Sequence, residues 1–195
     1  MSTRVILFAL TVLAQFALPV HMIRDRETVL REGTRYRFKT QPIDPADPFQ
    51  GRYVWLSIEQ DYIACKESTA NQIDYKTPGY ASIAIDNDGF AYFKDWHTTK
   101  PTTGDYLATR AQGKAHTWEI GADDRRHSTF KGMRIEIPFT RFYMDETKAP
   151  RAEILARDAT RHGDCWVEVR ILNGKAVIED VAAVGQSLRD LVAIE

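Results

Sequence analysis

Histidine and cysteine are the residue types in this sequence that most readily hold a metal ion or act as a nucleophile. A zinc site built from one local stretch needs a spacing such as His-x-His, His-Glu-x-x-His or Cys-x-x-Cys, and none of these occurs. The nucleophile pattern Gly-x-Ser-x-Gly is also absent. We therefore predict no metal and no cofactor from local motifs. The histidines are His21, His97, His116, His127 and His162.

Acidic residues and histidines spread along the chain offer general acid and base catalysis instead. Carboxylates and an imidazole could hydrolyse a substrate if they met in a cleft between two halves of the chain. The alternative function is therefore an anchored hydrolase-like enzyme, whose candidate residues are Asp44, Asp95, His97 and Glu146. Isolated residues without mutual geometry support catalysis weakly, so a non-catalytic role is favoured.

The two cysteines, Cys65 and Cys165, leave two interpretations open. An oxidising compartment would allow them to form a disulfide, whereas both could equally be small buried apolar residues. Separation in sequence does not give the Cα distance that a disulfide requires.

Length and composition predict one folded domain after an N-terminal segment. The chain has 195 residues, of which 44% are hydrophobic and 27% charged, which is typical of folded soluble domains. The formal net charge is -1, so the chain lacks the basic surplus of nucleic-acid-binding proteins. DNA and RNA are therefore excluded as expected partners.

Residues 5–23 form an apolar stretch between Arg4 and Arg24, and 15 of these 19 residues are hydrophobic. As a helix they would be about 28 Å long, close to the roughly 30 Å hydrocarbon core of a bilayer. An uncleaved single-pass anchor is the favoured interpretation. The alternatives are a cleaved secretory signal, for which the alanines lack the Ala-x-Ala spacing, and a buried core helix, for which a polar face is missing.

The anchor interpretation also predicts where the remaining chain lies. A short N-terminal stub that stays inside while a larger domain is exported is typical of a signal anchor, so residues 33–195 are expected outside the cytoplasm. Residues 1–32 hold four basic and three acidic residues, which leaves 22 basic and 24 acidic residues in the domain. Such a domain is not expected to bind anionic lipid by its overall charge.

Residue patterns after Gly33 predict a mainly β fold. A helical segment over 25–32 is expected to end at Gly33, and strands are expected near Tyr36 to Phe38 and over 53–58. Turn residues between alternating runs predict two hairpins, around Asp86 to Gly89 and at Asn173-Gly174. Two further pairs are expected: 106–110 with 116–120, and 133–139 with 153–156. The predicted fold is an antiparallel sandwich or barrel-like domain behind one transmembrane helix.

A constant offset of 85 residues indicates two related halves as a further hypothesis. It aligns Gly89 with Gly174, Ala91 with Ala176 and Asp95 with Asp180. A true repeat should show similarity along its whole period, so three matches leave chance agreement as the alternative.

The segment 42–58 carries a specific motif that includes two prolines, a glycine and a tyrosine. It resembles the motif of the GDYxxLxY family, bacterial membrane-anchored proteins of uncharacterised function. Arg52 stands in place of the family's aspartate and Ile58 in place of its final tyrosine, so no role that depends on that acid is carried over. Residues 141–146 look like the family's second-half strand, and the similar layout covers residues 4–185. The matching motif residues are Pro42, Asp44, Pro45, Gly51, Tyr53 and Leu56.

This resemblance implies an N-terminal anchor in the bacterial inner membrane, a periplasmic or extracytoplasmic β-rich domain, and no assigned activity. It also implies a multi-pass membrane protein as partner. The favoured function is accordingly an accessory or interaction module for an integral membrane protein.

Strand alternation over 53–58 indicates which side chains could bind that partner. Val54, Leu56 and Ile58 are expected to face the core, while Tyr53 and Trp55 face the other side. The exposed aromatic pair could be a binding surface, and coverage of a second sheet is the alternative. The candidate binding residues are Tyr53, Trp55, Asp44 and Arg52.

Overall fold

The computed structural model describes residues 3–41, 53–64, 73–114, 116–122 and 126–193. Several residues singled out in the sequence lie outside these ranges, and their predicted roles stay predictions. They are Pro42, Asp44, Pro45, Gly51, Arg52 and Cys65.

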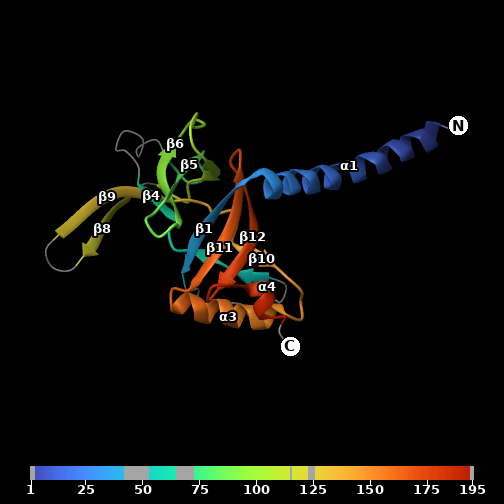
Figure 1. Ribbon diagram of the computed structural model, residues 1–195. Helices are drawn as coiled ribbons and strands as arrows, with labels where there is room; N and C mark the ends of the chain where they lie inside the picture. Colours follow the sequence, from blue (N-terminus) through green and yellow to red (C-terminus); the bar gives the residue numbers. More distant parts are fainter. Residues whose placement is uncertain (1–2, 42–52, 65–72, 115, 123–125, 194–195) are drawn as a thin grey trace.

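Helix α1 (Thr3–Glu32) forms the N-terminal part of the chain and extends away from the β-rich body (Figure 1). It ends as predicted at Gly33, whose N–H donates to the Val29 carbonyl at 2.9 Å. A Cβ at position 33 would lie 2.4 Å from that carbonyl oxygen, which leaves room for glycine only. Within the described residues, no helix has both the length and the apolarity needed to cross a membrane.

The largest sheet has five strands in the order β13-β12-β11-β1-β3. Its centre is the hairpin of β11 (Cys165–Leu172) and β12 (Lys175–Ala183), with β1 (Thr34–Gln41) on the other side of β11. Alternate residues of β11 are buried, as a strand with one core-facing side requires. The outer strands are β3 (Ser57–Ile58) and β13 (Gln186–Ser187). The predicted Asn173-Gly174 hairpin is confirmed.

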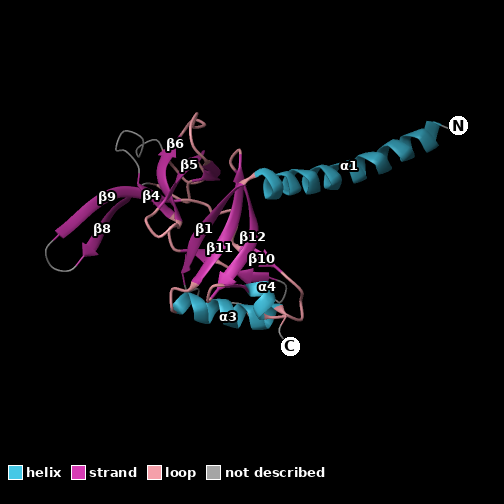
Figure 2. Cartoon of the chain, viewed as in Figure 1, coloured by secondary structure: helices cyan, strands magenta, loops and turns pink. Residues whose placement is uncertain are grey.

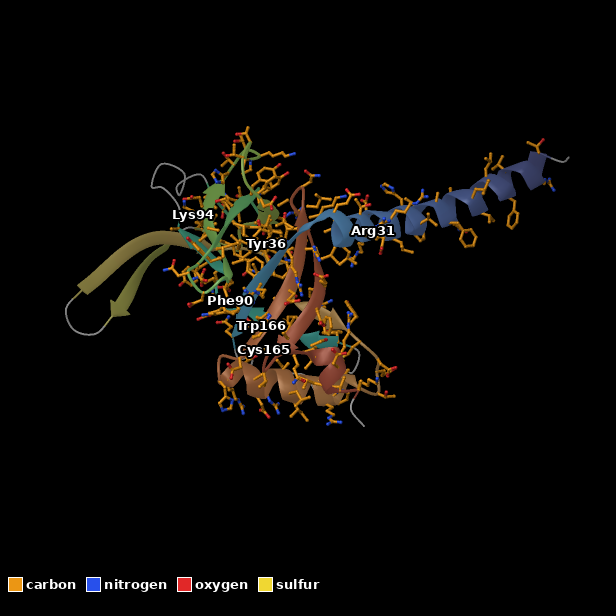
Figure 3. All side chains as sticks on the ribbon, in the orientation of Figure 1. Arg31, Tyr36, Phe90, Lys94, Cys165 and Trp166 are labelled. Atoms are coloured by element: carbon orange, nitrogen blue, oxygen red, sulfur yellow. The ribbon has the colours of Figure 1, made fainter. Side chains whose placement is uncertain are left out.

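A second sheet, in the order β6-β5-β7, packs against the first. It contains β5 (Pro78–Ile85), β6 (Ala91–His97) and β7 (Tyr106–Arg110), and the predicted β5–β6 hairpin is confirmed. Aromatic contacts join the two sheets. Phe38 stacks on Phe93 with 5.3 Å between ring centroids. Phe90 and Trp166, which Figure 3 labels, meet edge-on at 6.0 Å between ring centroids. Most of the buried residues form one hydrophobic core.

The other strands of the described residues form two smaller sheets. One has the order β4-β9-β8, with β4 (Tyr62–Ala64), β8 (His116–Ala122) and β9 (Arg126–Arg134). The other pairs β2 (Tyr53–Trp55) with β10 (Arg141–Tyr143). The predicted pairing of 106–110 with 116–120 is wrong, because β7 pairs with β5 and β8 pairs with β9.

The predicted strand over 153–156 is also wrong, because this segment belongs to helix α3 (Ala149–Arg161). Its buried alanines recur at intervals of three and four residues, which is the helical period, and a proline stands in the first turn. Helix α3 packs against β2, β11 and β12, and the short helix α4 (Leu188–Leu191) packs against α3 and β12. Figure 2 shows both helices together at the end of the large sheet. The buried alanines are Ala149, Ala152, Ala156 and Ala159.

The fold is thus mainly antiparallel β, as predicted. The described sheets are open and none of them closes into a barrel, so the barrel alternative is wrong. The two-halves hypothesis stays a prediction, although Gly89 and Gly174 occupy the same turn conformation, with φ of 82° and 81°.

Candidate functional site

The motif strand divides at Leu56 into two strands with different partners. Strand β2 pairs with β10, whereas β3 pairs with β1 of the large sheet. Leu56 itself donates its N–H to the Thr140 carbonyl at 2.8 Å. Val54, Leu56 and Ile58 are all buried, as the alternation predicts. The motif therefore connects the β2–β10 pair to the large sheet.

The partner strand β10 is the RFY segment of the second family-like stretch. Its antiparallel register places Tyr143 opposite Tyr53, Phe142 opposite Val54 and Arg141 opposite Trp55. Phe142 and Val54 are buried together on the core side. Directly opposed residues point to the same face of a sheet, so the other two pairs share the outer face.

Four side chains on this outer face form what we call the aromatic–arginine surface: Tyr53, Trp55, Arg141 and Tyr143. The ring centroid of Tyr53 lies 6.2 Å from that of Trp55 and 5.6 Å from that of Tyr143. Trp55 is 43% exposed and Tyr143 is 63% exposed. Large apolar surfaces left open on a folded domain are characteristic of interaction sites.

The guanidinium of Arg141 lies over two of these rings. Its Cζ is 5.2 Å from the centroid of Tyr53 and 5.3 Å from that of Trp55, which is cation–π distance. No carboxylate of the described residues lies within 4.0 Å of this guanidinium. The surface therefore presents flat aromatic faces together with a positive charge that no carboxylate in the described ranges neutralises.

The family assignment follows from a comparison with protein-family models. Residues 15–181 match the model described as "GDYXXLXY protein", and this range contains both strands of the surface. The chain belongs to the GDYXXLXY family. The family's description states a sequence pattern, of which this member keeps Gly51, Tyr53 and Leu56. No curated protein and no solved structure matches the chain.

The structure brings two of the predicted binding residues of this family member into the surface and adds two more. Tyr53 and Trp55 lie on the outer face of β2, and their binding role stays a prediction. Asp44 and Arg52 lie outside the described residues. The sequence did not indicate that Arg141 and Tyr143 join this surface, although their segment was noted, because their position beside Trp55 and Tyr53 depends on the register between β10 and β2.

The residues of the enzyme alternative lie on separate segments. Asp95 and His97 are on β6, and the Asp95 N–H donates to the Ser82 hydroxyl at 3.1 Å. Glu146 is in the turn before α3, and β6 and α3 lie at opposite ends of the molecule in Figure 1. No three His, Cys, Asp or Glu side chains among the described residues are placed to hold a metal ion. The enzyme alternative stays a prediction.

The acidic turn next to Glu146 has a structural role. Asp145 accepts hydrogen bonds from the Thr147 hydroxyl at 2.5 Å and from the Thr147 N–H at 2.9 Å. These bonds hold the pKa of the Asp145 carboxyl below its usual value, because they stabilise the ionised form. The turn is thereby fixed at the start of α3.

Cys165 is buried at the start of β11. Its predicted partner Cys65 lies outside the described residues, so the disulfide stays a prediction.

Proposed function

We propose that this protein is a membrane-anchored, non-catalytic interaction module. Its aromatic–arginine surface binds an extracytoplasmic part of a multi-pass protein in the bacterial inner membrane. The observation that carries the proposal is the open arrangement of Trp55, Tyr143 and Arg141 on a strand pair whose other face is packed into the core.

The composition of the surface supports protein binding. Tryptophan, tyrosine and arginine are the residue types that dominate the binding energy of protein interfaces. The buried pair Val54 and Phe142 holds the two strands from behind, so their outer side chains lose little conformational freedom when a partner binds.

The anchor part of the proposal is supported by residues 5–23 and by the large apolar side chains that α1 leaves exposed. A helix that belonged to the core of this domain would bury one face of these residues. We propose that they lie in lipid and that residues 33–195 lie on the periplasmic side. The exposed apolar residues of α1 are Leu7, Phe8, Leu10, Leu13, Phe16, Leu18, Val20, Met22 and Ile23.

The junction between α1 and the sheet supports a short, rigid link from membrane to domain. Val29 is 2% exposed in the last turns of α1, which pack against β11 and β12. Lys175 at the start of β12 donates to the Asp25 carboxylate at 2.7 Å. This bond holds the pKa of Asp25 below its usual value. The domain, and the surface on it, would therefore stay near the bilayer.

Cross-linked capture from native membranes tests the proposal. In one experiment, membranes that contain the full-length protein are extracted with alkaline carbonate, where an anchored protein stays in the pellet. In a second experiment, the protein is cross-linked in untreated membranes and purified, and its partners are identified by mass spectrometry. We expect one multi-pass protein at near-equal amount, and we expect Trp55→Ala or Tyr143→Ala to weaken its binding by roughly 30-fold, as loss of an interface hot spot does.

The matched control is Tyr75→Ala, which removes another aromatic residue that is 65% exposed but lies outside the surface. Full recovery of the partner with this control supports the assignment of the interface. Equal recovery with all three variants, while each remains folded, would show that the surface is not the interface. Release of the wild type by carbonate would refute the anchor.

A further inference from the structure

A hollow of about 510 Å³ lies between the end of α1, the segment 136–143 and the outer side of β12. Three arginines line it although they come from distant parts of the chain: Arg26 from α1, Arg141 from β10 and Arg189 from α4. The hollow is open to solvent, so a ligand could enter it without unfolding of the domain.

The charges in this hollow are unbalanced. Among the described residues, none of the three guanidiniums lies within 4.0 Å of a carboxylate, and Arg189 instead sits over the Phe142 ring at 4.9 Å. Glu136 is the one acid that lines the hollow in the described part of the chain. Three positive charges against one negative charge fit an anion, and guanidinium groups match the geometry of phosphate oxygens.

The lining of the hollow is mainly polar, but it includes the apolar side chains of Ile137, Phe139, Val177 and Ile178. Phe139 is fully buried and the others are half-buried. A small inorganic anion would leave these apolar side chains in contact with water. An amphiphile with an anionic head would cover both the arginines and the apolar side chains.

The hollow also lies beside the end of the apolar helix segment. Arg26 follows Ile23 by three residues, which is about 4.5 Å along a helix. A smaller cavity of about 240 Å³ adjoins it, shares Arg26 and Val177, and reaches back along α1 to Met22. If residues 5–23 lie in the bilayer, this pair of cavities begins at the depth of the lipid headgroups.

We infer that this hollow binds the phosphate headgroup of an anionic membrane phospholipid, through Arg26 and Arg189, with the apolar side chains of its lining against the lipid's first carbons. The inference rests on the proposed anchoring in a membrane. It assigns the lipid preference to one basic hollow, in a domain whose overall charge is close to neutral.

Lipid binding to the purified full-length protein in mild detergent tests the inference. Native mass spectrometry is used to titrate phosphatidylglycerol, phosphatidylcholine and inorganic phosphate. We expect one phosphatidylglycerol to bind at least tenfold more tightly than phosphatidylcholine. We expect Arg26→Gln or Arg189→Gln to remove about tenfold of that affinity. Both variants leave the aromatic–arginine surface unchanged.

Lys94→Gln is the matched control, because it removes one exposed positive charge from β6, which lies far from α4 (Figure 1). Unchanged lipid binding in this variant supports the inference. Equal weakening by all three substitutions, or equal binding of both lipids, overturns it. Displacement of the lipid by millimolar phosphate shows a soluble-anion site and also overturns it.

The assay needs neither a protein partner nor an intact bilayer. Its failure with normal carbonate extraction and normal partner capture would therefore reject the lipid site alone. Failure of those two experiments would instead reject the proposed function.

Discussion

Replacement of Gly174 by alanine probes the contact that joins the two main sheets. Gly174 is at the tip of the β11–β12 hairpin with φ of +81°. Its carbonyl accepts a hydrogen bond from the Ala108 N–H at 2.9 Å, and the two segments form an isolated bridge between the sheets. A Cβ at position 174 would lie 2.7 Å from Cε2 of Tyr106 and 3.0 Å from Cβ of Ala108.

Two separate costs add in this variant. A left-handed backbone conformation costs an L-residue about 1–2 kcal/mol. Overpacking against a well-packed neighbour costs about 1–3 kcal/mol more, because β7 or the hairpin must move. We therefore expect Gly174→Ala to lower the free energy of unfolding by about 2–5 kcal/mol, a large share of the stability of a domain of this size.

Gly185→Ala separates the two costs. Gly185 has φ of +77°, and no atom lies within 4 Å of the position of its Cβ. This control should lose only the backbone share, about 1–2 kcal/mol. Urea unfolding of both full-length variants in the same detergent measures the difference. Equal losses for the two variants would refute the reasoning, because the contact with Tyr106 and Ala108 would then cost nothing.

Two further predictions concern the core behind the surface and the ion pairs of the large sheet. Val54→Ala should lower the free energy of unfolding by roughly 2 kcal/mol, because it leaves a cavity behind β2. Trp55→Ala on the exposed face should cost about 1 kcal/mol or less, and urea unfolding compares the two. The Arg170 side chain donates to the Glu179 carboxylate at 2.7 and 3.0 Å and holds the pKa of that carboxyl below 4.5. Glu179 therefore stabilises the fold above about pH 4.5 and loses this contribution as the pH falls through its lowered pKa, so unfolding curves of Glu179→Gln should change less with pH in that range.

The hairpins were predictable because the residues that specify each turn and its two strands are adjacent in the sequence. Asn173-Gly174 and the Asp86 to Gly89 turn lie between alternating runs, and both glycines adopt the positive φ that these turns require. The end of α1 at Gly33 was local in the same sense, since the clash that excludes a side chain there comes from Val29, one helical turn earlier.

Helix α3 was missed because a short apolar run looks alike in a helix and in a strand. The four residues 153–156 are too few to show whether their apolar side chains recur with the helical or the strand period. The period becomes visible only over 149–159, where four alanines mark one helix face. Alanine is only weakly hydrophobic. The sequence therefore does not mark the face of α3 that packs against β2 and β11 as a buried face.

The pairing of β7 shows a different limit. Strand β5 takes both β6 and β7 as neighbours, so β7 was not available to pair with the next strand in sequence. Consecutive strands pair often but not always. Nothing in the sequence of residues 106–120 indicates that β7 pairs with an edge of β5 instead of with β8. Such pairing is decided by the packing of distant segments.

The aromatic–arginine surface depends both on local sequence and on the pairing of distant segments. Alternation alone assigned Val54 to the core and Trp55 to the other face, but Arg141 and Tyr143 join Trp55 only through a register between strands more than 80 residues apart. The two family-like stretches, which look independent in the sequence, are therefore one structural feature.

Arg141 belongs to the aromatic–arginine surface and also to the hollow beside α1, because its guanidinium covers the rings of Tyr53 and Trp55 while its strand forms one wall of the hollow. A change at Arg141 would alter a partner interface and a lipid site together, so it would separate neither proposal from the other. Arg26 and Arg189 line the hollow and do not belong to the surface, whereas Trp55 belongs to the surface and does not line the hollow. Tyr143, like Arg141, belongs to both. Loss of lipid with retention of the partner in the Arg26 and Arg189 variants, and the reverse in the Trp55 variant, is the pattern that two distinct binding functions on one small domain require.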